Sequence, residues 1–285
     1  MDGCFDIKSG REGGHREVCG QTLIEGDCIA RMRDIPASSF DVIMTSPPYN
    51  LGIGYDRHND KEPRERYLSW MSQVAEEMAR VLCQDGSLFL NVGGSLKDPL
   101  IPYQVLEVFL KHFVLQNNIV WTKSLWIEKA EKTFGHFKPI NSPRYLNHNF
   151  EHVFHLSHEG ATRIERLAVG VPFEWTSNIE RFGHEKNLRC RGNVWHLPYK
   201  SITSRKLARG GHPATFPVEL PKMCIRLAGI SGPAGRVRVL DPFLGTGTTL
   251  VAARDLGVSG TGIDLSKDYL DFAAERLTQD QGTKK

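Results

Sequence analysis

The sequence predicts an α/β protein in which helices cover both faces of a mostly parallel sheet. The first observation behind this prediction is that short apolar runs, such as 40–45 (FDVIMT), alternate with helical patterns. Such runs are typical of strands buried on both faces. The second is the segment 63–82, where apolar residues recur at helical spacing after a proline suited to a helix start. The third is a glycine-rich turn at 245–247 between a predicted strand and a predicted helix.

The predicted elements follow one another without a repeat or a low-complexity tract. A turn is expected at Asp85-Gly86, and Ser266 suits the N-cap of the last helix. The run at 150–156 alternates as one arm of a hairpin does. Strands are expected at 22–25, 40–45, 87–92, 118–123, 150–156, 236–240 and 259–263, and helices at 63–82, 103–113, 218–228, 248–256 and after Ser266.

The composition is that of a globular protein with one or two domains, since 40% of the 285 residues are hydrophobic and 24% are charged. No apolar run approaches the roughly 18 residues that span a bilayer. The first twenty residues lack the apolar core of a secretory signal. The six cysteines are scattered without a Cys-x-x-Cys pair, so neither a disulfide scaffold nor a zinc site is expected. We therefore expect a cytoplasmic protein with no membrane partner and no metal.

Positive charge is concentrated in residues 157–211. This segment holds ten Lys or Arg and five Glu, a net charge of +5, whereas the rest of the chain carries −2. Aromatic side chains such as Trp175 and Trp195 are interleaved with the cations. The mixture suits phosphate contacts and stacking on bases, with a solvated surface as an equal alternative. The expected organisation is a main domain at 21–156 and 212–280, an insertion at 157–211, and flexible tails at 1–20 and 281–285.

A glycine-rich loop lies between the predicted strand at 236–240 and the predicted helix at 248–256. Glycines at such a turn let backbone amides approach a ligand, and the helix N-terminus favours negative charge. No Gly-Lys-Ser/Thr is present, so a nucleoside triphosphate site is not supported. The next strand is followed by Asp264, which is placed to accept hydrogen bonds from ribose hydroxyls. The pattern predicts a site for a cofactor that carries adenosine, at Asp241, Pro242, Phe243, Gly245, Thr246, Gly247, Thr248 and Asp264.

A second motif, 45–50 (TSPPYN), ends the buried strand at 40–45. Ligands of open parallel sheets bind beyond the carboxyl ends of the strands, so this loop is expected to face the cofactor site. Two successive prolines stiffen the turn, and the Pro47 carbonyl is expected to point into the site as a hydrogen-bond acceptor. A turn that merely closes a strand is the alternative, and the nearby glycine loop makes it the weaker one.

At these two motifs the sequence resembles the DNA amino-methyltransferases, which transfer a methyl group from S-adenosylmethionine to an exocyclic base amine. Residues 46–49 (SPPY) match that family's [Asp/Asn/Ser]-Pro-Pro-[Tyr/Phe] motif, and 241–248 match its cofactor loop. A third match, 212–220 (HPATFPVEL), is similar to the segment that contacts the methionine part of the cofactor. The order of the matches resembles the circularly permuted beta group, whose target-recognition region precedes the third match. The resemblance covers about residues 21–280.

The resemblance implies a Rossmann-like methyltransferase fold with a mostly parallel sheet, a C-terminal hairpin and a target-recognition insertion. Ser46 and the sequence at 212–217 (HPATFP) are similar to the corresponding residues of enzymes that act on cytosine N4. Enzymes of the family that act on adenine more often carry Asp at the position of Ser46. The implied activity is site-specific methylation of cytosine N4 in double-stranded DNA, in the nucleoid of a prokaryotic cytoplasm. Methylation of adenine N6 and a DNA-binding module without catalysis are the alternatives. A nicotinamide dehydrogenase is remote, because Leu250 replaces the last glycine of Gly-x-Gly-x-x-Gly.

The chemistry of an aromatic amine agrees with this assignment. The amine is a poor nucleophile because its lone pair is delocalised into the ring. If Ser46 Oγ and the Pro47 carbonyl accept its two hydrogens, the nitrogen lone pair turns toward the methyl donor. The base must be flipped out of the duplex, and Tyr49 would stack on it, a contact worth about 1–3 kcal/mol. The expected site residues are Ser46, Pro47, Pro48 and Tyr49 for catalysis, Asp27, His212, Pro213 and Phe216 with the loop residues above for the cofactor, and Arg181, Arg189, Arg191 and Arg205 for DNA.

Several of these residues have a second interpretation. Asp27 suits either the adenine amine of the cofactor or a helix N-cap. Thr246 and Thr248 suit the cofactor carboxylate, and Thr248 suits a helix cap equally. Phe243 fits a cofactor wall or the core, and residues 50–61 form a mobile lid or an ordinary loop. Family habit alone implies a cognate restriction endonuclease, and the choice between monomer and homodimer is undetermined.

Overall fold

This computed structural model describes residues 7–9, 14–52, 60–135, 140, 142–181, 187–198, 216–229 and 237–279. The strands are β1 (Ile7–Ser9), β2 (His15–Val18), β3 (Gln21–Glu25), β4 (Phe40–Thr45), β5 (Leu82–Val92), β6 (Val114–Thr122), β7 (Ser124–Ile127), β8 (Lys132–Gly135), β9 (Phe150–Ser157), β10 (Val194–His196), β11 (Arg238–Asp241) and β12 (Ser259–Asp264). The helices are α1 (Cys28–Arg33), α2 (Arg64–Val81), α3 (Ile101–Phe109), the short 3-10 helix η1 (Glu128–Ala130), α4 (Ser177–Arg181), α6 (Glu219–Ala228), α7 (Thr248–Asp255) and α8 (Lys267–Thr278).

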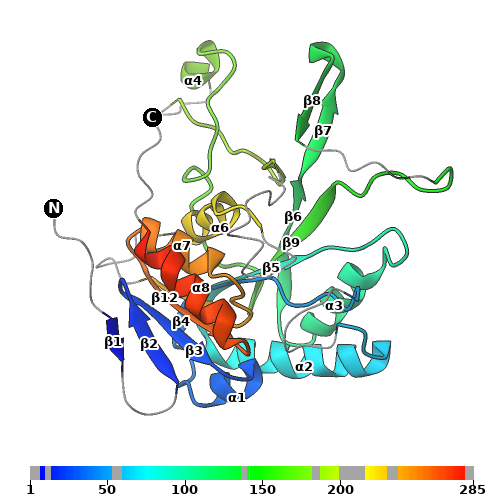
Figure 1. Cartoon of the computed structure of the whole chain (residues 1–285). Coiled ribbons are helices and arrows are strands. Elements are labelled where there is room, and N and C mark those ends of the chain that lie inside the picture. The colour runs from blue at the N-terminus through cyan, green and yellow to red at the C-terminus, as the bar shows by residue number, and fades with distance from the viewer. Residues whose placement is uncertain are drawn as a thin grey trace.

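One large sheet runs through the molecule, in the order β1-β2-β3-β12-β11-β4-β5-β9-β6-β10 (Figure 1). The five central strands from β3 to β5 are all parallel. Antiparallel strands flank them, β2 and β1 at one edge and β9 and β6 at the other. The predicted α/β fold with a mostly parallel sheet is therefore confirmed.

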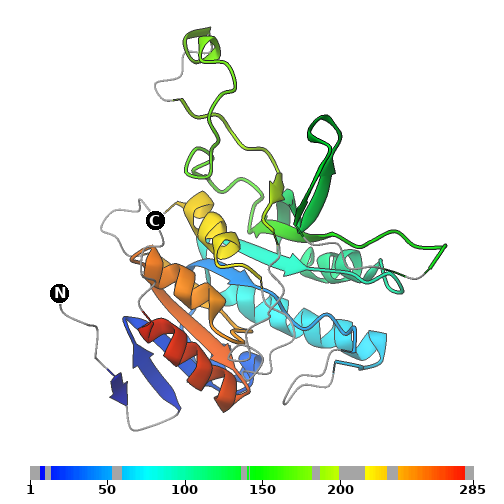
Figure 2. The same ribbon diagram turned by 45° about the horizontal axis from the view of Figure 1, so that its top comes forward.

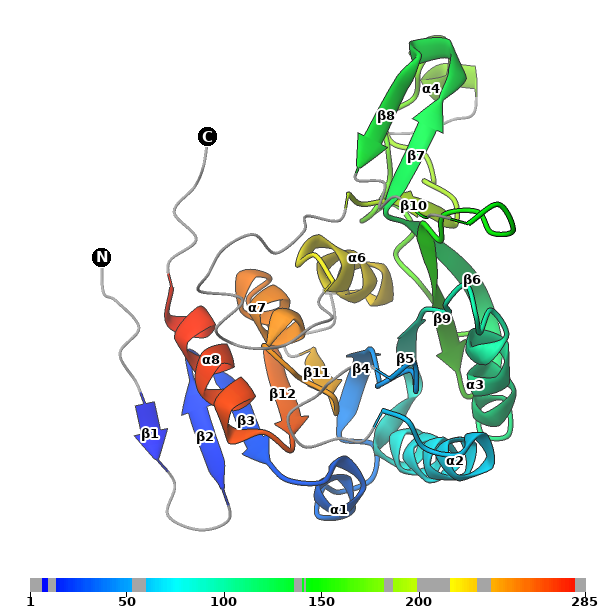
Figure 3. The same ribbon diagram turned by 45° about the vertical axis from the view of Figure 1, so that its right-hand side comes forward.

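Side chains alternate across the central strands and build a core on each face. Ile43 of β4 packs with α1, α2 and α3, whereas its neighbours Val42 and Met44 pack with α6 and α7. Figures 2 and 3 show α6, α7 and α8 grouped together, apart from α1, α2 and α3. The buried positions of α2 recur every three or four residues from Tyr67 to Val81, which confirms the helical stripe predicted at 63–82. The strand predicted at 40–45 is β4 with the same bounds.

Two predictions about local structure were wrong. The turn expected at Asp85-Gly86 lies within β5. This strand pairs Leu82 with Phe40 and then Ser87 with Val42 of β4, so residues 83–86 form an irregularity, similar to a β-bulge, between the two pairs. Residues 15–18, expected in a flexible tail, form β2. This strand pairs with β3 and buries Val18. The strand was not predicted because Val18 is its one buried apolar residue and the residues around it are polar.

The hairpin arm expected at 150–156 is confirmed as β9, whereas the C-terminal position that the resemblance implies for a hairpin was wrong. The antiparallel pair is β6 and β9, in the middle of the chain, and not at its C-terminus. The last elements, β12 and α8, belong to the parallel part of the sheet. The antiparallel pair β6 and β9 comes earlier in the chain than β11, the strand that precedes the glycine loop.

Part of the basic segment 157–211 belongs to the sheet itself. β10 pairs in parallel with β6 and places Trp195 beside Trp121, and both side chains are 1% exposed. Each indole N–H donates to a backbone carbonyl, that of Gly192 for Trp195 and that of Leu197 for Trp121. The segment is therefore anchored on the sheet edge, while α4 and the β7–β8 hairpin project from the body (Figures 1 and 3).

Candidate active site

The glycine loop between β11 and α7 is held in shape by Asp264. Gly245 and Gly247 have φ values of 52° and 82°, in the left-handed region that favours glycine. A Cβ on Gly247 would also lie 2.6 Å from the Ala273 Cβ of α8. The half-buried carboxylate of Asp264 accepts hydrogen bonds from the Gly245 amide at 2.7 Å and the Ser266 amide at 2.8 Å. The loop is thus fixed against the start of α8.

Asp241 links the glycine loop to residues 46–49, the predicted catalytic loop. Its Oδ1 accepts from Thr45 Oγ1 at 2.7 Å and from the Phe243 amide at 3.1 Å, and its Oδ2 accepts from Thr249 Oγ1 at 2.6 Å. Burial raises the pKa of this carboxyl to about 6, although the hydrogen bonds oppose the effect. The sequence predicts Asp241 as a cofactor contact, but its carboxylate points into the protein because these three donors hold it there. Asp241 is therefore a positioning residue.

We expect Asp241→Asn to remove a pH dependence of stability. The folded-state pKa of about 6 exceeds the ordinary 3.8, so the folded protein binds this proton more tightly than the unfolded chain does. The associated stabilisation is complete below about pH 4 and is lost as the pH rises through about 6, a change of about 3 kcal/mol. Urea unfolding of both proteins at pH 4.5 and 7.5 measures about two thirds of this change, roughly 2 kcal/mol. The free energy of unfolding of the variant, relative to the wild type, should rise with pH, and an unchanged difference would contradict the prediction.

Three other predicted cofactor contacts engage protein groups. Arg276 Nη1 of α8 donates to Thr248 Oγ1 at 3.0 Å and to Thr246 Oγ1 at 3.2 Å. Both threonines are at most 5% exposed and their hydroxyls accept from α8, so their contact with the cofactor carboxylate stays a prediction. Asp27 Oδ1 accepts from the Ala30 amide at 2.9 Å, which is the N-cap that the sequence left as the alternative. Because Asp27 stays exposed, its other carboxylate oxygen can still reach solvent or a ligand.

Aromatic rings line the other side of the glycine loop. The half-buried Phe243 ring lies edge-on to Trp70 of α2, with 5.6 Å between the ring centroids. Phe216 instead packs against the core below α6. His212 and Pro213 lie outside the described residues, and so does Arg205. The described part of the site fits an adenosine-bearing molecule, because glycine amides, the Asp264 carboxylate and an aromatic wall lie at one strand-to-helix turn.

The catalytic loop, residues 46–49, rests on a network of polar side chains. Ser46 Oγ lies 2.6 Å from the Tyr49 hydroxyl, which lies 3.2 Å from Glu151 Oε2. Asn91 Nδ2 donates to the same hydroxyl at 2.7 Å and to Glu151 Oε2 at 2.6 Å. Lys123 Nζ forms an ion pair with Glu151 Oε1. These groups come from the ends of β4, β5 and β6 and the start of β9.

The stacking of Tyr49 on a flipped base stays a prediction, and the structure shows how this tyrosine is held. Its side chain is only 9% exposed, and its hydroxyl is held by Ser46, Asn91 and Glu151. The Pro48 carbonyl accepts from the Tyr67 hydroxyl of α2 at 2.8 Å, so the second proline also serves to fix the loop. Sequence reasoning missed the polar partners of the loop. A polar Asn91 at the end of the apolar run 87–92 was the only signal for one of them.

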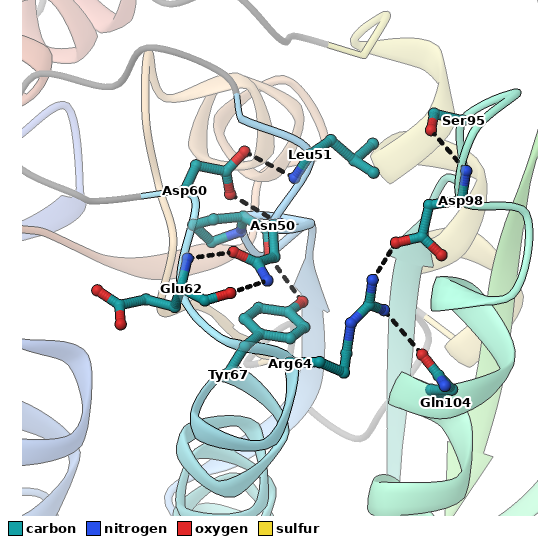
Figure 4. A network of polar contacts seen from close by, with 10 residues as sticks. Asn50, Leu51, Asp60, Glu62, Arg64, Tyr67, Ser95, Asp98 and Gln104 are labelled. Carbon is teal, nitrogen blue, oxygen red and sulfur yellow. Dashed lines mark hydrogen bonds and ion pairs between the residues drawn. The ribbon is translucent and has the colours of Figure 1, made fainter.

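The two ends of the segment after the catalytic loop are clamped together (Figure 4). Asp60 Oδ1 accepts from the Asn50 amide at 2.7 Å and its Oδ2 from the Leu51 amide at 3.0 Å. The Asn50 side chain exchanges two hydrogen bonds of 2.8 Å with the backbone of Glu62. Residues 53–59 lie outside the described residues. The segment predicted as a lid or loop therefore starts and ends at residues that are held together by hydrogen bonds, Asn50 and Leu51 on one side and Asp60 and Glu62 on the other.

The described candidate DNA contacts differ in their surroundings. Arg181 and Arg189 are exposed, on α4 and in the loop before β10. Arg191 is half-buried, and its Nε donates to the Val169 carbonyl at 2.9 Å. Arg191 thus also supports the fold of its segment.

In the described part of the chain, no group of three or more His, Cys, Asp or Glu side chains is arranged to hold a metal. Among the same residues, no helix is long and apolar enough to cross a bilayer.

Comparisons with known proteins place this architecture in a family. A family model described as DNA methylase, of the N6/N4 methyltransferases, matches residues 40–275. The chain is 28% identical to the type II methyltransferase M.ScaI of Streptomyces caespitosus, over 95% of this chain and 86% of that protein. It is 27% identical to the DNA adenine methyltransferase YhdJ of Escherichia coli K12, over 96% and 86%. The chain therefore belongs to the N6/N4 DNA methylase family.

Solved structures share the fold. The PvuII DNA methyltransferase, described as cytosine-N4-specific, superposes with a TM-score of 0.65 at 18% identity, over 92% of this chain and 88% of that one. The Thermus thermophilus protein TTHA0409, solved in complex with S-adenosyl-L-methionine, gives 0.59 at 24% identity, over 90% and 94%. The Rossmann-like methyltransferase fold is thus confirmed.

Proposed function

We propose that this protein transfers a methyl group from S-adenosylmethionine to the exocyclic N4 amine of a cytosine in DNA. The observation that carries the proposal is the hydrogen bond between Thr45 and Asp241, which brings the loop that starts at Ser46 beside the glycine loop. A serine hydroxyl at that place is a neutral group that can accept an amine hydrogen. The family match to the N6/N4 DNA methylases supports the reaction class.

We assign cofactor binding and orientation of the target amine to different residues of the chain. S-adenosylmethionine supplies an electrophilic methyl group, and Asp264 with the glycine loop would hold its adenosine part. Ser46 Oγ and the Pro47 carbonyl accept the two hydrogens of the target amine and orient its lone pair. The base reaches them only when it is flipped out of the duplex. No covalent enzyme intermediate is needed.

Three further features belong to the same proposal. The beta-group order is supported by the chain order, in which the catalytic strand β4 precedes the basic segment and the cofactor strand β11 follows it. The basic segment 157–211 would recognise the target. The names of the type II relatives support a restriction-modification setting, with a cognate endonuclease as partner.

Methylation of adenine N6 is the second candidate, because one relative of similar identity is named a DNA adenine methyltransferase. A labelling experiment separates the two. The protein is incubated with double-stranded DNA and methyl-labelled S-adenosylmethionine, and the labelled nucleoside is identified by mass spectrometry against standards. We expect N4-methylcytosine. N6-methyladenine would overturn the base assignment, and cofactor binding without any transfer, on DNA of several genomes, would indicate a DNA-binding module without catalysis.

Arg189 is expected to contact a DNA phosphate. Its side chain is exposed in the basic segment, with one long hydrogen bond of 3.4 Å to the Cys190 carbonyl, whereas Arg191 is half-buried and donates to the Val169 carbonyl at 2.9 Å. We expect Arg189→Gln to weaken binding on all sequences and to reduce the slope of log K against log salt by about one. Fluorescence anisotropy at several salt concentrations measures this, with Arg163→Gln, an exposed arginine paired with Glu165, as the control. A loss of preference at a single base pair with an unchanged slope would instead identify a base contact.

A further inference from the structure

The polar network under the catalytic loop forms a directed chain of hydrogen bonds. Its links are Ser46 Oγ to the Tyr49 hydroxyl at 2.6 Å and the Tyr49 hydroxyl to Glu151 Oε2 at 3.2 Å. Glu151 comes from β9 and is paired through its other oxygen with Lys123, which directly follows β6. The chain therefore joins the group next to the target amine to a carboxylate on a different part of the sheet.

The donors and acceptors fix the direction of this chain. A carboxylate can only accept, and Tyr49 has a single hydroxyl hydrogen, which it donates to Glu151. Tyr49 Oη therefore accepts the hydrogen of Ser46 Oγ. Asn91 Nδ2 adds a donor to both Tyr49 Oη and Glu151 Oε2, which keeps these two oxygens as acceptors. Ser46 Oγ accepts a hydrogen bond from Asn91 Nδ2 at 3.3 Å with one of its two lone pairs, and the second lone pair is available to an incoming N–H.

The position of Glu151 is built for this arrangement. A Cβ at Gly93 would lie 2.8 Å from Glu151 Cγ, so a glycine after β5 leaves the space that the glutamate occupies. The Glu151 side chain is 12% exposed and that of Lys123 is 25% exposed, so the pair is shielded from bulk water but not sealed from it. The Lys123 Nζ also lies 5.1 Å from the centroid of the Trp121 ring, which fixes the cation from a second side.

We propose that Glu151 receives the proton that the target amine loses, through Tyr49 and Ser46. The proposal rests on the methyl transfer proposed above. In that reaction a nitrogen–carbon bond forms while the sulfur–carbon bond breaks, and the electron pair of the broken bond stays on sulfur. The nitrogen is left with a positive charge and gives one proton to Ser46 Oγ. The Ser46 proton passes to Tyr49 Oη, and the Tyr49 proton passes to Glu151 Oε2, from which it is released to water. Glu151 thus acts through other residues and is a positioning residue.

Glu151→Gln tests the relay, because it keeps the shape of the side chain and removes the acceptor charge. Glu77→Gln is the matched control, since Glu77 is also ion-paired and 13% exposed but lies near the end of α2. We expect kcat of Glu151→Gln to fall about 10²-fold or more, the usual range for a lost proton acceptor. The KM for DNA and the Kd for S-adenosylmethionine, measured by calorimetry, should change less than about twofold. The fluorescence of 2-aminopurine at the mapped target base, which reports flipping, should be unchanged.

Two further variants keep the test decisive if the glutamine variant is unstable. Tyr49→Phe breaks the chain without changing a charge and should lower kcat similarly. The double variant should be no slower than the slower single variant, because the two residues act as a unit. Glu151→Asp should recover part of the rate.

The outcomes separate the relay from the reaction. A wild-type protein that transfers no methyl group overturns the proposed function and the relay with it. A wild-type protein that methylates DNA, together with a folded Glu151→Gln variant of unchanged kcat, overturns the relay alone. The relay is also overturned if the rate loss of Glu151→Gln is explained by weaker cofactor binding or by lost base flipping. A selective loss of kcat in both single variants supports it.

Discussion

Replacing Ser46 by alanine is expected to lower kcat by about 10²–10³, which corresponds to about 2.7–4 kcal/mol of transition-state stabilisation. In the proposed reaction this hydroxyl accepts a hydrogen of the target amine and passes its own hydrogen to the Tyr49 hydroxyl, which lies 2.6 Å away. The glycine loop is fixed by Asp264 and Asp241, neither of which contacts Ser46 Oγ. The affinity for S-adenosylmethionine should therefore be unchanged. Single-turnover methyl transfer and calorimetric cofactor binding measure the two quantities separately.

Ser39→Ala is the matched control, because the Ser39 hydroxyl donates to the Pro36 carbonyl just before β4, at the end of the strand opposite the catalytic loop. It should keep the full rate. A Ser46→Ala variant with unchanged turnover would remove Ser46 from the active site. A variant that also fails to bind cofactor would show that the hydroxyl supports the fold of the site and not the reaction.

The elements that the sequence predicts well are those with a strong periodic pattern. The apolar run of β4 and the buried stripe of α2 are explained by residues close together in the chain. β2 and β10 were not predicted, because each buries one large side chain, Val18 or Trp195, within a polar segment. Such short strands near the ends of the sheet are specified by their partner strands and leave little trace in their own sequence.

The same distinction applies to the candidate site. The motifs at 46–49 and 241–248 were found because each is contiguous and follows a buried strand. The direction of their side chains was not predictable. Thr246 and Thr248 were expected at the cofactor, yet they turn toward Arg276, a residue about thirty positions away. Glu151 and Lys123 were missed because the antiparallel pairing of β6 with β9 brings them together, and pairing partners are not encoded locally.

Trp195→Ala is expected to cause the largest loss of stability among the changes considered. The side chain is 1% exposed and packs against the core of the α6 and α7 face, and its indole N–H donates to the Gly192 carbonyl. Truncation of a buried Trp costs about 3–5 kcal/mol, a large part of the roughly 5–15 kcal/mol that stabilises a domain. Trp175→Ala, in the same basic segment but with a side chain that is 66% exposed, should cost less than about 0.5 kcal/mol.

The pair of tryptophan variants also tests how the basic segment is attached. Because β10 lies at the sheet edge, outside the parallel strands that hold the glycine loop, its loss should detach the segment first. Trp195→Ala is then expected to weaken DNA binding strongly while S-adenosylmethionine binding persists below the new, lower Tm. Equal melting temperatures for the two variants would contradict the burial of Trp195. Simultaneous loss of DNA and cofactor binding at about 20 °C would show that β10 and the parallel sheet unfold as one unit, so that target recognition and catalysis share a single cooperative core.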